Sequence, residues 1–294
     1  MGANDACCAC GGGEGITEPE PPQPTPTPPR PSPPTPTPPR PSPPTTPTSP
    51  RPTRTPTAIN YLVDVLVVYT TEAMNNNPGG RERDMENFIT GLGSDTNTAL
   101  SNSGSTVRIN IVGTYHNTQF TKDINGRYSN QQWMNMLTNT NDGNFDYEVT
   151  TLRNSLKADF VVLLGEYVPS GLGRIQGEFG VVRRYIADIG AAFAHEVGHM
   201  LGALHNIEDN EIYDRNYYDG SNVGYIDRPN CFRTIMSYPD NVGCRNAGCR
   251  GGSCSIILYF SNTVATYNGH PTGSPVANNA KYIDSKGSKS VNWK

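Results

Sequence analysis

The chain has 294 residues, and 20 of its 26 prolines lie in the first 56, so the part that can bury a core begins near Thr57. In that part 19 Lys and Arg are outnumbered by 23 Asp and Glu, and a net charge of −4 offers no basic surface to nucleic acid. The longest apolar runs, YLVDVLVVY and DFVVLLGEY, fall well short of the roughly 18 residues of a membrane span. We expect one folded domain at 57–294, with neither a nucleic-acid partner nor a membrane span.

The segment before that domain divides into two parts. Residues 1–18 are expected to be a flexible head rich in Cys and Gly, and residues 19–56 a linker of Pro, Thr, Ser and Arg in which PTPTPPRPSP occurs twice in tandem. This composition favours extended polyproline II at about 3.1 Å per residue. We interpret the linker as a spacer; a ligand for PxxP-binding domains and an O-glycosylated, wall-binding stalk are its functional alternatives.

Hydrophobic patterning in the folded part indicates strands and helices in its first half and mainly loops in its second. Gly171 and Gly173 are expected to form a loop, and beyond residue 201 Gly, Asn, Asp, Pro and Cys dominate. In chain order we expect a strand at 61–69, a helix at 81–101, a strand at 107–114, helices at 130–138 and 147–156, a strand at 160–167, an extended run at 176–184, a helix at 189–201, an extended run at 255–260 and a short helix at 277–282.

Four cysteines cluster in the loop-rich half of the folded part. Cys231, Cys244, Cys249 and Cys254 allow three pairings, and in an exported protein we expect two disulfides. The C-x4-C-x4-C spacing of the last three leaves a second, small metal site as one alternative. Reduced thiols are the other.

The pattern that carries chemistry is HEVGHMLGALH at residues 195–205. His195 and His199 are four residues apart, so on a helix they share one face and can bind one metal ion. Gly202 can adopt the left-handed backbone that ends a helix, which turns the chain and returns His205 to the same metal as third ligand. Histidines that merely pack or face solvent are the alternative, but HExxHxxGxxH fixes five positions.

These ligands predict one catalytic Zn²⁺ with a fourth position open for water. Zinc lowers the pKa of that water towards about 7. Glu196, next to the first ligand, is placed to take the water proton as general base and to pass it to the leaving amine. The predicted chemistry is peptide hydrolysis without a covalent intermediate.

A second motif, RTIMSY at 233–238, follows the zinc motif, and together the two resemble the metzincin metallopeptidases. The resemblance implies that Met236 lies in the Met-turn, an apolar floor beneath the metal. Tyr238 is similar to a tyrosine that some metzincins place near the metal, where its phenol donates a hydrogen bond to the oxyanion. A packed Tyr that supports the turn is the alternative.

The sequence most resembles the reprolysin-like peptidyl-Asp metalloendopeptidases, because FAHEVGHMLGALHN, RTIMSY and the tail LYFSNTVATYNGHPTG with VANNAKYI occur in that order. The resemblance implies a mixed α/β fold: a twisted mixed β-sheet, two long helices, a zinc helix ending at a Gly turn, a Met-turn and a loop-rich lower subdomain. It also implies secretion and cleavage next to acidic residues. Two features depart from the pattern: Asn206 stands where Asp usually follows the third His, and no Cys directly precedes the zinc helix.

Other charged residues follow the zinc motif in the sequence. Glu211 in NEIYD is similar to the glutamate ligand of thermolysin-like enzymes, but Gly202 and His205 already have the metzincin spacing, so we interpret it as a solvated loop acid. A preference for acidic residues requires a cation beyond the scissile bond. Arg215, Arg228 and Arg233 are the candidates, and each is alternatively a surface charge.

The function predicted from the sequence is that of a secreted, monomeric zinc metalloendopeptidase that cleaves internal bonds of protein or peptide substrates. No signal peptide is visible, so secretion is inferred from the resemblance and the clustered cysteines. An inactive metallopeptidase-like binding or wall-associated module is the main alternative. A further one is a latent enzyme in which Cys7, Cys8 or Cys10 occupies the open position of the zinc.

Overall fold

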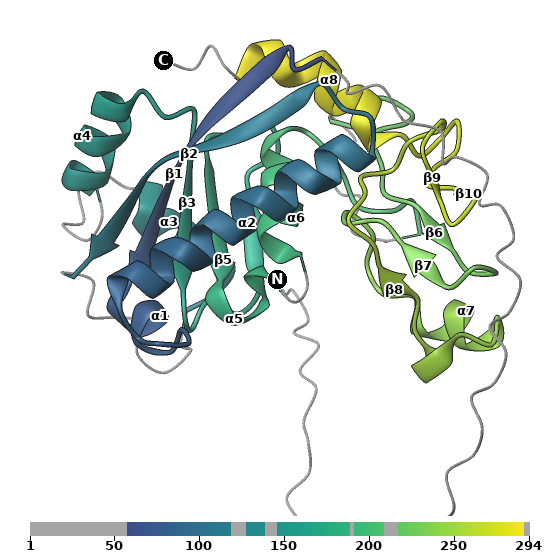
Figure 1. Ribbon diagram of the computed structural model, residues 1–294, viewed down its shortest axis with the longest axis horizontal. Helices are drawn as coiled ribbons and strands as arrows, with labels where there is room; N and C mark the ends of the chain where they lie inside the picture. Colours follow the sequence, from purple (N-terminus) through teal and green to yellow (C-terminus); the bar gives the residue numbers. More distant parts are fainter. Residues whose placement is uncertain (1–57, 119–127, 139–145, 189–190, 209–216, 291–294) are drawn as a thin grey trace, which may run out of the picture. The chain divides into compact units, whose positions relative to one another are not determined.

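A central β-sheet organises the part of the chain that the computed structural model describes (Figure 1). The head at 1–18, the linker at 19–56, Glu211 and Arg215 all lie outside the described residues. The described residues are 58–118, 128–138, 146–188, 191–208 and 217–290.

The sheet has five strands in the order β2-β1-β3-β5-β4, and its first four strands are parallel. The near-continuous apolar runs of β1 and β3 follow from their position inside the sheet, because parallel strands there are covered on both faces. The last strand, β4, runs antiparallel to β5 and forms an edge. The strands are β1 (Tyr61–Thr70), β2 (Val107–Asn117), β3 (Phe160–Gly165), β4 (Gly171–Gly173) and β5 (Phe179–Arg183).

Strand β4 corrects the prediction of a loop at Gly171 and Gly173. Three residues, two of them glycine, carry no alternating pattern that could reveal a strand. The strand forms instead because it pairs with β5, with Gly171 opposite Val182 and Gly173 opposite Gly180.

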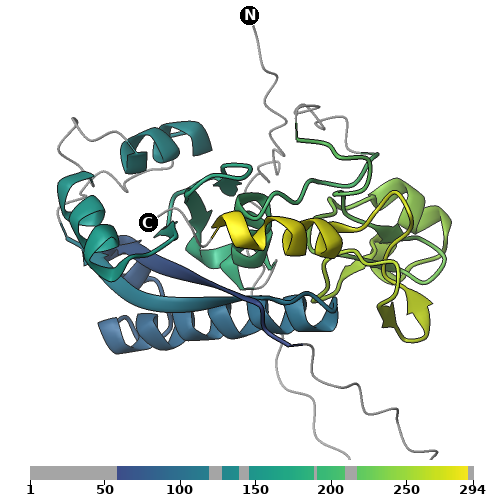
Figure 2. The ribbon, with the colours of Figure 1, turned by 90° about the horizontal axis from the view of Figure 1, so that it is seen from above.

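Helices cover both faces of the sheet, as Figures 1 and 2 show. Alternate side chains of β1 point to opposite faces. Val65 and Val67 pack with α2 (Glu82–Asn102) and α6 (Ala192–Met200), whereas Leu66 and Val68 pack with α3 (Asn130–Thr138) and α4 (Asp146–Leu156). None of the helices in the described ranges is long and apolar enough to cross a bilayer.

Helix boundaries agree closely with the sequence pattern where a helix is long. The starts and ends of α2, α3 and α4 lie within a residue of those predicted. Two short helices, α1 (Thr71–Asn75) and α5 (Arg184–Ala187), were not predicted because a single turn has no period to detect. At the other end, α8 (Asn279–Ser290) is longer than the predicted helix at 277–282.

The second half of the domain consists mainly of loops, as predicted. The bonds Cys231–Cys249 and Cys244–Cys254 confirm the two expected disulfides and leave no thiol there for a second metal site. Its short elements are β6 (Ile226–Asp227), β7 (Phe232–Arg233), α7 (Asn241–Asn246), a 3-10 turn (Arg250–Gly252), β8 (Ser255–Ile256), β9 (Thr266–Tyr267) and β10 (His270–Pro271).

Candidate metal centre

Helix α6 places His195 and His199 one turn apart on the same side. The helix is buried nearly all round, because Phe193, Val197 and Met200 pack in the core beneath the sheet. A helix enclosed in this way holds its side chains in fixed directions. The two histidines are therefore rigidly presented.

The chain leaves α6 through a glycine turn, as predicted. Gly202 has φ +89°, its N–H donates to His199 O at 2.8 Å, and the next N–H, of Ala203, donates to Gly198 O at 2.8 Å. This pair of bonds defines a Schellman motif, whose left-handed residue favours glycine. A Cβ on Gly202 would also lie 2.6 Å from the Tyr282 ring. The turn directs the chain back so that His205 faces α6.

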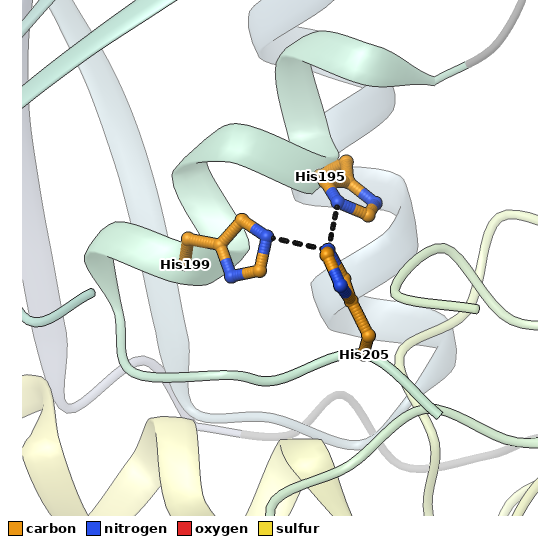
Figure 3. Close-up of side chains that lie close together, drawn as sticks. All are labelled: His195, His199 and His205. Atoms are coloured by element: carbon orange, nitrogen blue, oxygen red, sulfur yellow. Dashed lines mark hydrogen bonds between the residues drawn. The ribbon is translucent and has the colours of Figure 1, made fainter. Parts of the chain in front are cut away.

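The three imidazoles converge through their Nε2 atoms (Figure 3). His205 Nε2 lies 3.1 Å from His195 Nε2 and 2.9 Å from His199 Nε2. A tetrahedral ion with Zn–N distances of about 2.0 Å separates its ligand atoms by about 3.3 Å. The observed spacing therefore fits one zinc ion between the rings.

Backbone carbonyls fix the orientation of two of the candidate ligands. His195 Nδ1 lies 2.9 Å from Ile235 O, and His199 Nδ1 lies 2.9 Å from Ala203 O. A carbonyl can only accept, so each Nδ1 carries the proton and each Nε2 of the neutral ring presents its lone pair inward. Burial lowers the pKa of His205 to about 4 and that of His199 well below its usual value, which keeps both neutral. Neutral imidazole is the form that binds a metal.

Glu196 lies beside the triad and is only 6 % exposed. Burial raises its pKa to about 8, and a hydrogen bond from the Gly173 N–H opposes this rise. The backbone of β4 runs directly against the carboxylate, since a Cβ on Gly171 would overlap Glu196 Oε1. A nearby cation would favour the ionised carboxylate. The glycines of β4 thus hold the predicted base in place, a role that the sequence did not reveal.

Met236 lies below the zinc helix and is completely buried. It sits in a tight turn closed by the Ser237 N–H, which donates to Thr234 O at 3.0 Å. A Cβ on Gly198 would be 2.5 Å from Met236 Sδ and 2.8 Å from a Phe260 ring carbon. Because residue 198 is glycine, the helix can pack directly against the turn that contains Met236.

Tyr238 packs against the ligands, with its ring centroid 4.0 Å from that of His205. The ring lies parallel to that of His195 at 6.0 Å, and the side chain is 41 % exposed. Its backbone N–H donates to Asn206 Oδ1 at 2.9 Å, and Asn206 Nδ2 donates to Glu208 Oε2 at 3.1 Å. Asn206 is thus an acceptor for the turn, and the amide makes a further bond that an aspartate could not donate.

A buried amide network supports the segment that carries His205. Asn279 Nδ2 donates to Asn222 O at 2.7 Å, and Asn222 Nδ2 donates to Gly202 O at 3.0 Å. Ser261 Oγ joins them through Asn279 Oδ1 at 2.9 Å. Ser261 and Asn279 lie in the tail that carries the resemblance, but no role was predicted for them, and Asn222 lies outside that tail. Their joint signal was a pair of asparagines in an otherwise apolar stretch.

Of the three arginines that the sequence offers as cations for an acidic substrate residue, the structure describes Arg228 and Arg233, and these two have different partners. Arg228 pairs with Asp240 and, at 3.1 Å, with Glu208. Arg233 donates from Nη1 to Ser237 O, and its Nε has no partner among the described residues.

Comparison with known proteins shows the family to which this chain belongs. Residues 60–247 match the family model Reprolysin_5, described as metallo-peptidase family M12. The chain belongs to metallopeptidase family M12. Members of this family depend on a metal ion, usually zinc, and the histidine triad fits that dependence. The mixed α/β fold and the metzincin resemblance expected from the sequence are confirmed.

Three relatives of this M12 chain carry the name peptidyl-Asp metalloendopeptidase. Those of Stenotrophomonas maltophilia strains R551-3 and K279a are each 29 % identical over 72 % of the chain, and that of Xanthomonas campestris pv. campestris is 28 % identical over 72 %. The M12 chain spans about half of their length, at 47, 48 and 46 %. A solved structure described as a chaperone-substrate complex shares the fold, with TM-score 0.57 and 19 % identity over 79 % of this chain and 36 % of that one.

Proposed function

We propose that this chain is a zinc-dependent endopeptidase that hydrolyses internal peptide bonds of proteins. The observation that carries the proposal is the convergence of three Nε2 atoms beside a buried carboxylate. When bound, zinc supplies a Lewis acid that polarises a peptide carbonyl and lowers the pKa of a water molecule towards about 7. His195, His199 and His205 would hold it.

Glu196 acts as general base in this proposal. Its carboxylate accepts the proton of the attacking water and later passes it to the amine that leaves. The Gly173 N–H stabilises the ionised form, while the dry surroundings keep its pKa high enough for it to accept a proton. Tyr238, whose ring packs on His205, is positioned for its phenol to donate to the developing oxyanion.

The edge strand β4 provides a binding surface for an extended substrate. One side of β4 pairs with β5, and the Glu196 carboxylate lies against its glycines. On its other side Gly171 O accepts from Asn130 Nδ2 at 3.0 Å and the Gly173 N–H donates to Glu196, so an extended peptide added beside β4 passes the catalytic carboxylate. Such binding needs no free chain end, which favours cleavage of internal bonds.

Secretion, a monomeric state and a preference for acidic residues complete the proposal. Two disulfides persist only in an oxidising compartment, which supports export. The name of the relatives supports cleavage next to aspartate. Met236, buried beneath α6, is assigned to the Met-turn as an apolar floor.

The first test is metal content together with hydrolysis of casein, with and without a chelator. We expect one zinc per chain and chelator-sensitive cleavage. Glu196→Ala should lower turnover by at least about 10²-fold while zinc stays bound. Zinc bound without any cleavage by the wild type would contradict the proposal and favour a binding module.

The latent-enzyme alternative has a separate test. A head cysteine that blocks the zinc would be removed with residues 1–56, so that deletion would raise activity. We expect the activity of the shortened chain to equal that of the full one.

A further inference from the structure

Strand β4 presents the backbone groups of its two glycines on the side that faces away from β5. In an antiparallel pair, alternate residues bond to the partner strand. The Arg183 N–H donates to Ser170 O at 2.7 Å, so the groups of Gly171 and Gly173 point the other way. On that side the Gly173 N–H donates to the Glu196 carboxylate. The position of this short strand therefore decides how the proposed base is held.

The side chain of Asn130 reaches the start of β4 from α3. Its Nδ2 donates to Gly171 O at 3.0 Å and to Ser170 Oγ at 2.8 Å, and its Oδ1 accepts from the Ser170 N–H at 3.2 Å. An aspartate could not donate to the Gly171 carbonyl, because a carboxylate only accepts. Asn130 thus bonds to one glycine of β4, and Glu196 bonds to the other.

Helix α3 is fixed independently of this contact. Ser129 Oγ accepts from the Gln132 N–H at 3.2 Å, and Gln132 Oε1 accepts from the Ser129 N–H at 2.8 Å, which together form a capping box. Trp133 and Leu137 are buried against the sheet face opposite to α6. Because the capping box and the core hold the helix, the Asn130 amide can anchor the strand.

The last residue of α3 contacts the other end of β4. Arg174, which follows the strand, donates from Nη2 to Thr138 Oγ1 at 3.2 Å. Asn130 and Thr138 are the first and last residues of α3, so one helix bonds to both ends of the strand. A strand of three residues, two of them glycine, has few side chains to pack and gains little stability of its own. Its position therefore depends on α3.

We propose that Asn130 is a positioning residue for the reaction, and that its amide holds β4 where the Gly173 N–H meets the Glu196 carboxylate. The proposal rests on the proposed endopeptidase function. Without the amide, Gly171 O loses this donor and the strand can move away from Glu196. The carboxylate then loses its alignment with the triad, and a misplaced base slows proton transfer although every metal ligand is intact.

The first arm of the test measures kcat on casein with the zinc-loaded full chain. Asn130→Ala should lower kcat by at least about tenfold while zinc stays bound, because a small displacement of a catalytic group is costly. Ser170→Ala should keep most of the activity, since the bonds to Gly171 O and to the Ser170 N–H remain. Gln131→Ala should keep all of it, because that side chain bonds to Asn135 within the helix.

The second arm measures amide hydrogen exchange by NMR and needs no turnover. Val162 lies in the central strand β3, and its amide reports unfolding of the whole domain. In Asn130→Ala the exchange of the Gly173 amide should rise at least about tenfold more than that of Val162, because hydrogen bonds that hold β4 are lost. Gln131→Ala should leave the ratio of the two exchange rates unchanged.

A Gly173 amide that exchanged no faster relative to Val162 would show that Asn130 does not hold the strand, and would overturn the proposal. A faster Gly173 amide with unchanged kcat would also overturn it, because the strand would then not position the base. So would a loss of kcat in Ser170→Ala as large as that in Asn130→Ala. If the exchange rates changed as expected but the wild type cleaved nothing, the hold of Asn130 on β4 would stand and the endopeptidase function would fall.

Discussion

Glycine serves two different purposes within the eleven residues of the zinc motif. Gly202 is required for its backbone, because φ +89° is strained for any residue with a Cβ. Gly198 has an ordinary helical backbone and is required for space, since Met236 and Phe260 press against its Cα. Gly202 determines where His205 lies, and Gly198 determines how closely α6 packs against Met236 and Phe260.

Gly198→Ala tests the second role. We expect it to lower the free energy of unfolding by about 1 to 3 kcal/mol, because the added methyl group overpacks the contact with Met236 Sδ. Gly91→Ala is the control: Gly91 lies within α2 with nothing within 4 Å of a Cβ, and the change should stabilise by about 0.5 to 1 kcal/mol. Chemical denaturation measures both, and equal effects would contradict the packing argument.

His205 is the proposed ligand that the turn supplies. Replacing it should therefore reduce the stabilisation of the fold by zinc. Zinc at about 100 times its Kd should raise the free energy of unfolding of the chelated wild type by about 2.7 kcal/mol. We expect His205→Ala to show much less of this gain at the same zinc concentration. His270→Ala, at an exposed position on β10, should retain it. A thermal melt series with and without zinc decides between these outcomes.

At the scale of elements, the first residue of α8 supports the segment after α6. Asn279 is fully buried and joins the Asn222 carbonyl, and Asn222 in turn holds Gly202 O. The side-chain amides of Asn279 and Asn222 thus satisfy backbone carbonyls of this loop segment.

Asn279→Ala should therefore destabilise the fold by about 1 to 3 kcal/mol, the cost of leaving buried carbonyls unsatisfied. It should also weaken zinc binding, because Leu204, next to His205, loses a neighbour. Lys281→Ala, at an exposed position two residues along the same helix, should change neither. The two variants are compared by denaturation and by zinc titration. Unchanged zinc affinity in Asn279→Ala would show that the amide network does not support the metal site.

At the scale of the molecule, the two halves are stabilised differently. The first half has a five-stranded sheet with helices on both faces, while the half that contains Arg233 has short strands and two disulfides. Replacing Cys244 and Cys254 with Ser should cost about 2 to 3 kcal/mol, since the cross-link restricts the unfolded chain. Zinc content should be unchanged, because no ligand lies in that loop. Loss of zinc in the double variant would show that the loop supports the triad.

The sequence was most informative where structure is local. The proposed zinc ligands span eleven residues, and their convergence needs one helix turn and one glycine, so spacing alone predicts it. The long helices could be located because they repeat their pattern over several turns. The contacts to Ile235 O, the Gly173 N–H and Asn279 join residues far apart in the chain, and no local pattern encodes them. Strand β4 was missed for the same reason.

The network that ends at Asn279 also determines when the centre can form during synthesis. The last ligand, His205, leaves the ribosome 74 residues before Asn279, and 30 before the orienting carbonyl of Ile235. A nascent chain thus carries all three histidines before it carries Ile235, which orients His195, and Asn279, whose network supports the segment of His205. With the proposed endopeptidase function, this order would delay the cutting geometry until residue 279 has been made, and the delay would limit damage to the chains growing beside it.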